Sequence, residues 1–111
     1  MPVIIEPGGM HERRGEGWEE TVLADAASIG APAMTARRLR LGPGAAARAA
    51  VHEEGAEQFL YVVSGAGVAA AGDERWMLER ETVVWAEPGD EIDLEAGPEG
   101  IEVLIARAPA E

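Results

Sequence analysis

The sequence contains no cysteine and few basic residues. A chain without cysteine can form no disulfide, zinc–thiolate site, iron–sulfur cluster or cysteine nucleophile. Its 9 basic residues stand against 21 acidic ones, which gives a formal net charge of −12 at pH 7. Proteins that bind nucleic acids or anionic membranes need a basic surface instead. The composition therefore predicts that neither a nucleic acid nor a membrane is a partner.

Long apolar runs are missing as well. No run approaches the roughly 18 residues of a membrane-spanning helix. The start of the sequence, MPVIIEPGG, lacks the basic residues and the long apolar core of a signal peptide. We therefore expect a cytoplasmic protein. The hydrophobic content of 47% is typical of a folded domain, and 111 residues suit a single domain spanning 1–111.

Glycine and proline interrupt the chain at short intervals. The 14 glycines and 7 prolines separate short apolar or alternating runs, which is typical of an all-β sandwich or barrel. The alanine-rich run 45–50 favours a helix by propensity, but it follows a Gly-Pro-Gly turn, so we assign it to a strand. The predicted strands are Val3–Ile5, Thr21–Leu23, Thr35–Leu41, Ala45–His52, Gln58–Val63, Gly67–Ala71, Arg75–Leu78, Thr82–Trp85, Glu91–Glu95 and Ile101–Arg107. The predicted turns include 42–44, 64–67, 72–73, 88–90 and 97–100.

Side-chain alternation assigns the faces of two predicted strands. In the strand 91–95, Ile92 and Leu94 share one face and three acidic residues share the other, which is typical of a half-buried strand. In the strand 58–63 both faces are apolar, as expected for a strand inside a sandwich that also packs outward on another element. These residues predict a small and mostly apolar interior.

Two stretches resemble the sequence motifs of the small cupins. Residues 41–67, LGPGAAARAAVHEEGAEQFLYVVSGAG, are similar to a first motif with a glycine turn, H-x-H, three or four residues, a glutamate, six residues and a glycine. Residues 85–92, WAEPGDEI, are similar to a second motif in which P-x-G is followed two residues later by a histidine. The resemblance implies a double-stranded β-helix, a jelly-roll-like barrel with a pocket at one end. It places the barrel core at about 34–107, after an N-terminal strand and loop region over about 1–33.

The family's metal ligands are not retained at the matching positions. The resemblance implies a divalent metal held by the two histidines and the glutamate of the first motif and the histidine of the second. The motif glycines align Val51, Glu53, Gln58 and Ile92 with these four positions. Valine and isoleucine have no lone pair to donate, and the other two residues are too few for a transition-metal site. We therefore expect no metal or other cofactor and predict a ligand pocket that includes Val51, Glu53, Gln58, Leu60 and Ile92.

A slipped register gives an alternative metal site. His52 and Glu57 also have the family's histidine–glutamate spacing, and Asp93 then takes the place of the last histidine. These three side chains would resemble a histidine–carboxylate triad. The slip, however, leaves seven residues rather than six before the motif glycine. It also turns Asp93 inward and Ile92 toward water, whereas the apolar pattern favours Ile92 inside.

Several side chains have both a structural and a functional interpretation. Gln58 is either a ligand-binding amide or a satisfied core amide, and Glu53 is either a buried acid–base group or, as we favour, part of the pocket rim. His11 and the acidic pairs 19–20 and 53–54 are expected on the solvated surface. An arginine that pointed into the pocket would bind a carboxylate, although surface pairing is more common. The arginines concerned are Arg37, Arg38, Arg40 and Arg48.

The predicted function is the binding of a small organic ligand in the barrel pocket without a transition metal. The alternatives are a metal-dependent enzyme, such as a dioxygenase or isomerase with non-standard ligands, and a non-catalytic dimeric scaffold. Trp18, Trp76 and Trp85 pack on the core or a dimer surface, or form an aromatic wall of the pocket. We also expect a homodimer, because the apolar run Val3–Ile5 is suited to extending a neighbour's sheet.

Overall fold

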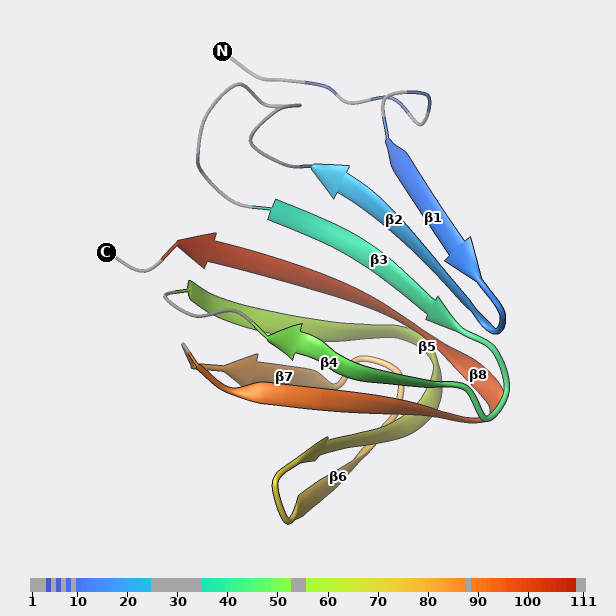
Figure 1. The fold of residues 1–111 in the computed structure, drawn as a ribbon, viewed down its shortest axis with the longest axis vertical. Helices are drawn as coiled ribbons and strands as arrows, with labels where there is room; N and C mark the ends of the chain where they lie inside the picture. Colours follow the sequence, from blue (N-terminus) through green and yellow to red (C-terminus); the bar gives the residue numbers. More distant parts are fainter. Residues whose placement is uncertain are drawn as a thin grey trace.

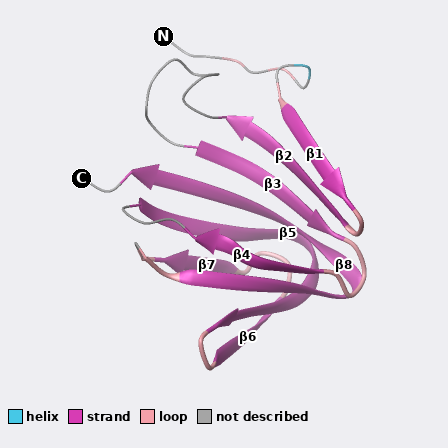
Figure 2. Cartoon of the chain, viewed as in Figure 1, coloured by secondary structure: helices cyan, strands magenta, loops and turns pink. Residues whose placement is uncertain are grey.

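Strands make up most of the protein (Figure 1; Figure 2). The computed structural model describes residues 4, 6, 8, 10–24, 35–52, 56–87 and 89–109. Its strands are β1 (His11–Gly15), β2 (Trp18–Ala24), β3 (Thr35–Leu41), β4 (Ala46–His52), β5 (Ala56–Ala71), β6 (Glu74–Leu78), β7 (Val83–Ala86) and β8 (Glu91–Pro109). Within the described ranges, no helix is long and apolar enough to span a membrane.

Two long strands, β5 and β8, bend sharply and thereby take part in two sheets (Figure 1). In the first sheet, residues 56–65 of β5 pair with residues 101–109 of β8, which is extended by β3, β2 and β1, while β7 pairs with β5. In the second sheet, residues 67–70 of β5 pair with residues 93–96 of β8, and β4 and β6 lie outside them. Every one of these pairings is antiparallel. The inward faces of the two sheets enclose the core.

The bends in β5 and β8 lie at Gly65 and Gly100. Both residues have positive φ, 80° and 79°, and a Cβ on Gly65 would collide with the backbone of Gly100. Only glycine combines this backbone conformation with such a close approach at low cost. We predicted that turns at 64–67 and 97–100 would end one strand and begin the next. That prediction is wrong, because each strand continues through its bend with an irregular register.

The core is formed by inward-facing side chains of both sheets. As predicted, Ile92 and Leu94 are buried on one face of β8, while Glu91 and Glu95 are exposed on the other. The buried apolar residues are Leu39, Leu41, Leu60, Val62, Ala69, Leu78, Ala86, Ile92, Leu94, Ala96, Ile101, Val103 and Ile105. Burial of these side chains is the main favourable contribution to folding.

Most of the other predicted strands are confirmed to within two residues. The bounds of β3 are as predicted, and the alanine-rich run forms β4. The strand β1 was not predicted, because all five of its residues are exposed and the sequence has no apolar alternation there. It forms by pairing with β2, which is longer than the predicted strand Thr21–Leu23. Of the predicted strand Val3–Ile5, the two end residues lie outside the described residues, and Ile4 is exposed and not in a strand.

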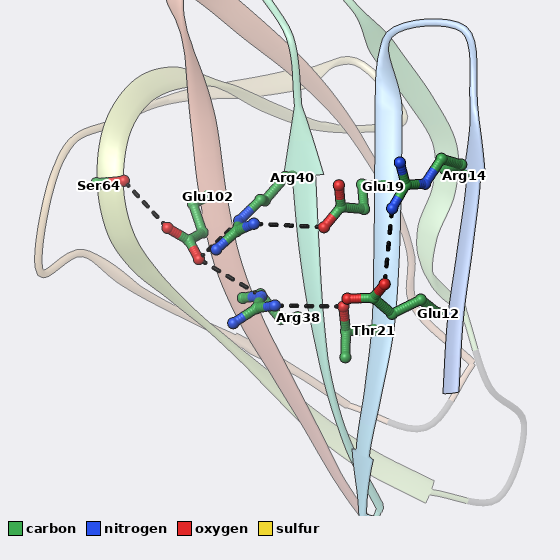
Figure 3. Close-up of polar contacts among 8 residues, drawn as sticks. All are labelled: Glu12, Arg14, Glu19, Thr21, Arg38, Arg40, Ser64 and Glu102. Carbon is green, nitrogen blue, oxygen red and sulfur yellow. Dashed lines mark hydrogen bonds and ion pairs between the residues drawn. The ribbon is translucent and has the colours of Figure 1, made fainter. Parts of the chain in front are cut away.

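A polar network covers the outer face of β2, β3 and the second half of β8 (Figure 3). Arg40 Nη1 lies 3.3 Å from Glu19 Oε1, and Arg40 Nε lies 3.1 Å from Glu102 Oε2. Arg38 Nε lies 3.6 Å from Glu102 Oε2, and Arg38 Nη2 donates a 3.3 Å hydrogen bond to Thr21 Oγ1. These two arginines therefore pair with acidic side chains on the outside of the sheet.

Candidate functional site

A cleft of about 520 Å³ lies between β6 and β7. Among the described strands, each of these two pairs with β5 alone, so the cleft opens between an edge of the first sheet and an edge of the second. We call it the apolar cleft. Its lining residues are Ala71, Glu74, Trp76, Met77, Leu78, Thr82, Val83, Val84, Trp85, Asp90 and Ile92.

The apolar cleft has a buried floor and exposed aromatic walls. Leu78 and Ile92 of the floor are 2% and 4% exposed and belong to the core. Trp76 and Trp85 are 43% and 60% exposed. The Trp85 ring stacks on Phe59 of β5, with ring centroids 6.4 Å apart and planes 4° apart, which restricts the orientation of the indole. The cleft therefore offers apolar surface from the core out to solvent.

The residues of the predicted pocket lie on both sheets. Ile92 lines the apolar cleft. Leu60 and Gln58 are 0% and 5% exposed on β5, and Leu60 belongs to the same core as Ile92. Val51 pairs with Ile92 in the backbone register of β4 and β8, whereas Glu53 lies outside the described residues. The structure thus brings Val51 and Ile92 to adjacent positions of one sheet.

The alternative metal site needs Asp93 to face inward. In the structure Asp93 is flanked by Ile92 and Leu94, which are 4% and 2% exposed, and alternation then turns Asp93 to the outer face. Glu57 is exposed as well, and His52 pairs with Glu91 in the backbone register. In the part of the chain that the structure describes, no three His, Cys, Asp or Glu side chains lie close enough together to hold a metal ion.

A second cleft, of about 260 Å³, lies between β4 and the β2–β3 pair. We call it the polar cleft, because Glu20, Arg37 and Arg48 line it beside Trp18 and Leu39. The expectation that Glu20 is solvated is wrong, since this residue is only 7% exposed. Alternation in β2 places Glu20 on the inward face, opposite Leu39 of β3, while its neighbour faces out.

Two arginines neutralise the buried Glu20 carboxylate. Its Oε1 accepts a hydrogen bond from Arg13 Nη2 and its Oε2 accepts one from Arg37 Nη1, both at 2.7 Å. Burial by itself raises the pKa of this carboxyl, but the hydrogen bonds and charges of the two arginines outweigh burial and hold the pKa below its usual range. Glu20 is therefore ionised at neutral pH. Arg37, which we considered as a clamp for a ligand, holds a carboxylate of the protein itself.

Two antiparallel sheets that share bent strands and enclose one apolar core form a double-stranded β-helix, and the solved structures similar to this chain include cupins. The chain has the cupin fold, as the motifs predicted. It is similar to KdgF from Halomonas sp., with a TM-score of 0.78 and 17% identity over 100% of this chain and 96% of that one. It is also similar to an RmlC-like cupin from Shewanella frigidimarina, with a TM-score of 0.76 and 16% identity over 100% of this chain and 94% of that one.

A third similar structure is a predicted oxalate decarboxylase from Thermotoga maritima, with a TM-score of 0.75 and 18% identity over 96% of this chain and 99% of that one. No family model matches the sequence, and no curated protein matches it. Similarity at this level of identity establishes the fold and leaves the activity open, because one fold supports many activities. The function has to be argued from the clefts themselves.

Proposed function

We propose that the protein binds a small organic molecule in the apolar cleft and needs no transition metal to do so. One observation carries the proposal: Ile92, at the position that the cupin motif assigns to a histidine, is instead part of an apolar floor. An isoleucine cannot ligate a metal, but it can pack against the carbon atoms of a ligand.

The size and lining of the cleft support this proposal. Small-molecule sites in proteins are mostly apolar clefts of roughly 300–1,000 Å³ with a few polar groups. The apolar cleft has about 520 Å³, and its polar lining is confined to Glu74, Thr82 and Asp90. Its aromatic walls add area at low entropic cost, because an indole has only two side-chain torsions.

The test uses phenol, indole and naphthol as neutral probes, with the indole N–H signals of the three tryptophans followed by NMR. We expect the signals of Trp76 and Trp85 to shift, while that of Trp18 in the polar cleft stays in place. Dialysis against EDTA should not change the result. Absence of any shift at millimolar probe, or binding that EDTA abolishes and Mn²⁺ or Zn²⁺ restores, would overturn the proposal.

A second candidate function is that of a non-catalytic scaffold formed by a homodimer. Large apolar side chains are exposed on neighbouring strands of the first sheet: Val83 at 56%, Trp85 at 60% and Phe59 at 36%. Contiguous exposed apolar surface of this kind is typical of protein–protein contacts. Light scattering at high micromolar concentration tests this role, because a monomer there would exclude it. Deletion of residues 1–6 should weaken the dimer if the N-terminal run contributes.

A further inference from the structure

We infer that the ligand of the apolar cleft is an organic cation with an alkylated ammonium group. This inference rests on the proposed function, because it specifies the chemistry of a ligand for the same cleft. Three features of the lining support it: its charge, its indole rings and its apolar floor. The charge and the indole rings are independent of the cupin motifs.

The charge of the lining is negative. Glu74 and Asp90 are its two ionisable residues, and no arginine lines the cleft. Arg75 lies on the opposite face of β6, where its Nη2 is 3.9 Å from Glu95 Oε2. Among the described residues, neither Glu74 nor Asp90 forms an ion pair, although Asp90 accepts a 2.9 Å hydrogen bond from the backbone N–H of Glu87. In a protein of net charge −12, this lining attracts cations and repels anions.

The two indole rings favour the same kind of ligand. The face of a tryptophan ring carries partial negative charge and attracts a cation more strongly than any other side-chain ring does. Trp76 lines the cleft from the inward face of β6, and Trp85 borders it from the outer face of β7; they keep 43% and 60% of their surface exposed. Stacking on Phe59 holds Trp85 in place before a ligand arrives, which reduces the entropy lost on binding.

The apolar floor selects among cations. Leu78, Val84 and Ile92 offer only hydrocarbon to a bound group. A methylated ammonium carries its charge under a layer of methyl groups, so it loses little hydration against such a floor, whereas a primary ammonium is strongly hydrated. A hard metal cation needs six or more oxygen ligands. The two exposed carboxylates of the lining cannot supply them.

The experiment compares choline with its neutral carbon isostere, in which a tert-butyl group replaces the trimethylammonium group. NMR titration of the wild-type protein measures both affinities from the indole N–H signals. Because both indole rings are partly exposed, we expect each ring to strengthen the binding of choline over that of the isostere by about 2- to 5-fold. The preference should decrease when the salt concentration rises from about 0.01 M to about 0.15 M, since salt screens the charges of the lining.

Three variants locate the effect. Trp85→Leu keeps an apolar wall but removes a ring, and it should weaken choline by about 2- to 5-fold more than it weakens the isostere. Glu74→Gln should weaken choline alone. Trp18→Leu, in the polar cleft, is the matched control and should change neither affinity. Unchanged thermal unfolding of the variants excludes a loss of fold.

The outcomes separate this inference from the proposed function. Equal affinity of choline and the isostere would contradict the inference that the ligand is a cation. A preference for choline that Trp85→Leu and Trp18→Leu alter equally would contradict it as well. In the first case the apolar cleft would still be a ligand site. Binding of the neutral aromatic probes without binding of choline would contradict the cation inference but leave the proposed function intact. If no probe binds, both the cation inference and the proposed function are contradicted.

Discussion

The polar cleft and the apolar cleft differ in how they use their charged residues. In the polar cleft, the Glu20 carboxylate is buried and already accepts hydrogen bonds from Arg13 and Arg37. In the apolar cleft, Glu74 and Asp90 are exposed, and within the described residues no arginine pairs with them. Both clefts lie between the same two sheets, so the fold does not dictate their chemistry.

Burial explains the difference. A charge that leaves water loses several kcal/mol of hydration and must be compensated by partners inside the protein. An exposed carboxylate keeps its hydration and can stay unpaired until a ligand arrives. The charges of the polar cleft therefore serve the stability of the fold, whereas those of the apolar cleft are available for binding. The predictions below test this division.

The largest change is expected from converting the predicted pocket into a metal site. The combined substitutions Val51→His, Glu53→His, Gln58→Glu and Ile92→His restore the donor set that the cupin motifs imply. The wild-type protein, purified without chelator or metal-affinity tag, should hold no stoichiometric transition metal, and the variant should hold close to one ion per chain by elemental analysis. Near-stoichiometric iron, nickel, manganese or zinc in the wild type, lost on His52→Ala, would instead establish the slipped register.

A large loss of stability is expected when the ion pairs of the buried Glu20 carboxylate are broken. Glu20→Gln leaves the guanidinium groups of Arg13 and Arg37 without their carboxylate. Because the side chains of Arg13 and Arg37 are 72% and 31% exposed, we expect the free energy of unfolding to fall by about 2 kcal/mol, less than for a fully buried pair. The exposed pair of Glu12 and Arg14, 3.6 Å apart, is the control. Glu12→Gln should cost less than about 0.5 kcal/mol in urea unfolding. Equal costs would contradict the division between the clefts.

The stabilising effect of Glu20 should depend on pH. Its pKa is lowered in the folded protein, so the unfolded chain takes up a proton first as the pH falls. The contribution is therefore complete above the unfolded pKa and is lost as the pH drops through the folded one. The difference in melting temperature between wild type and Glu20→Gln should be full at pH 7 and should shrink below about pH 4.

Melting of the wild type alone gives a weaker version of this test. Acid also relieves the self-repulsion of a chain with net charge −12, which acts in the opposite direction. We expect the loss of ion pairing to dominate modestly, so the protein should be less stable near pH 4 than near pH 7. A melting temperature that rises in acid would show that repulsion dominates.

The smallest effect on stability is expected in the apolar cleft. The side chain of Trp85 is 60% exposed, and Trp85→Leu keeps an apolar contact with Phe59. Substitutions at such surface positions usually change the free energy of unfolding by about 0.5 kcal/mol or less. Calorimetry should therefore show nearly unchanged unfolding, although ligand affinity falls. A cost as large as that of Glu20→Gln would mean that Trp85 is a structural residue.

The sequence predicted the core of the barrel better than its clefts. Alternation placed Ile92 and Leu94 inside correctly, because that signal lies within one strand. Gly65 and Gly100 were interpreted as ends of strands, since a bend and a turn both require a glycine with positive φ. Whether pairing continues beyond such a glycine depends on the partner strand, and that information is not local.

The clefts depend on contacts between distant segments. The burial of Glu20 follows from partners 7 and 17 residues away on two other strands, which no pattern within β2 reveals. Trp76 and Trp85 could be proposed as an aromatic wall from residue type alone. That they line one cleft follows only from the pairing of both β6 and β7 with β5.

The sharing of β8 between the two sheets has a consequence for biosynthesis. The first half of β8 pairs with β4 and its second half with β3, while both halves pair with β5. The pairing with β5 extends to the end of β8, where Pro109 lies opposite Ala56. Neither sheet can therefore be completed before β8 has left the exit tunnel of the ribosome. Contacts of such long range form slowly, because the chain must close large loops first. Until then, among the described strands, only the pairings that do not involve β8 can form, namely β1–β2, β2–β3, β5–β6 and β5–β7. The excess of acidic charge helps to keep the nascent chain soluble.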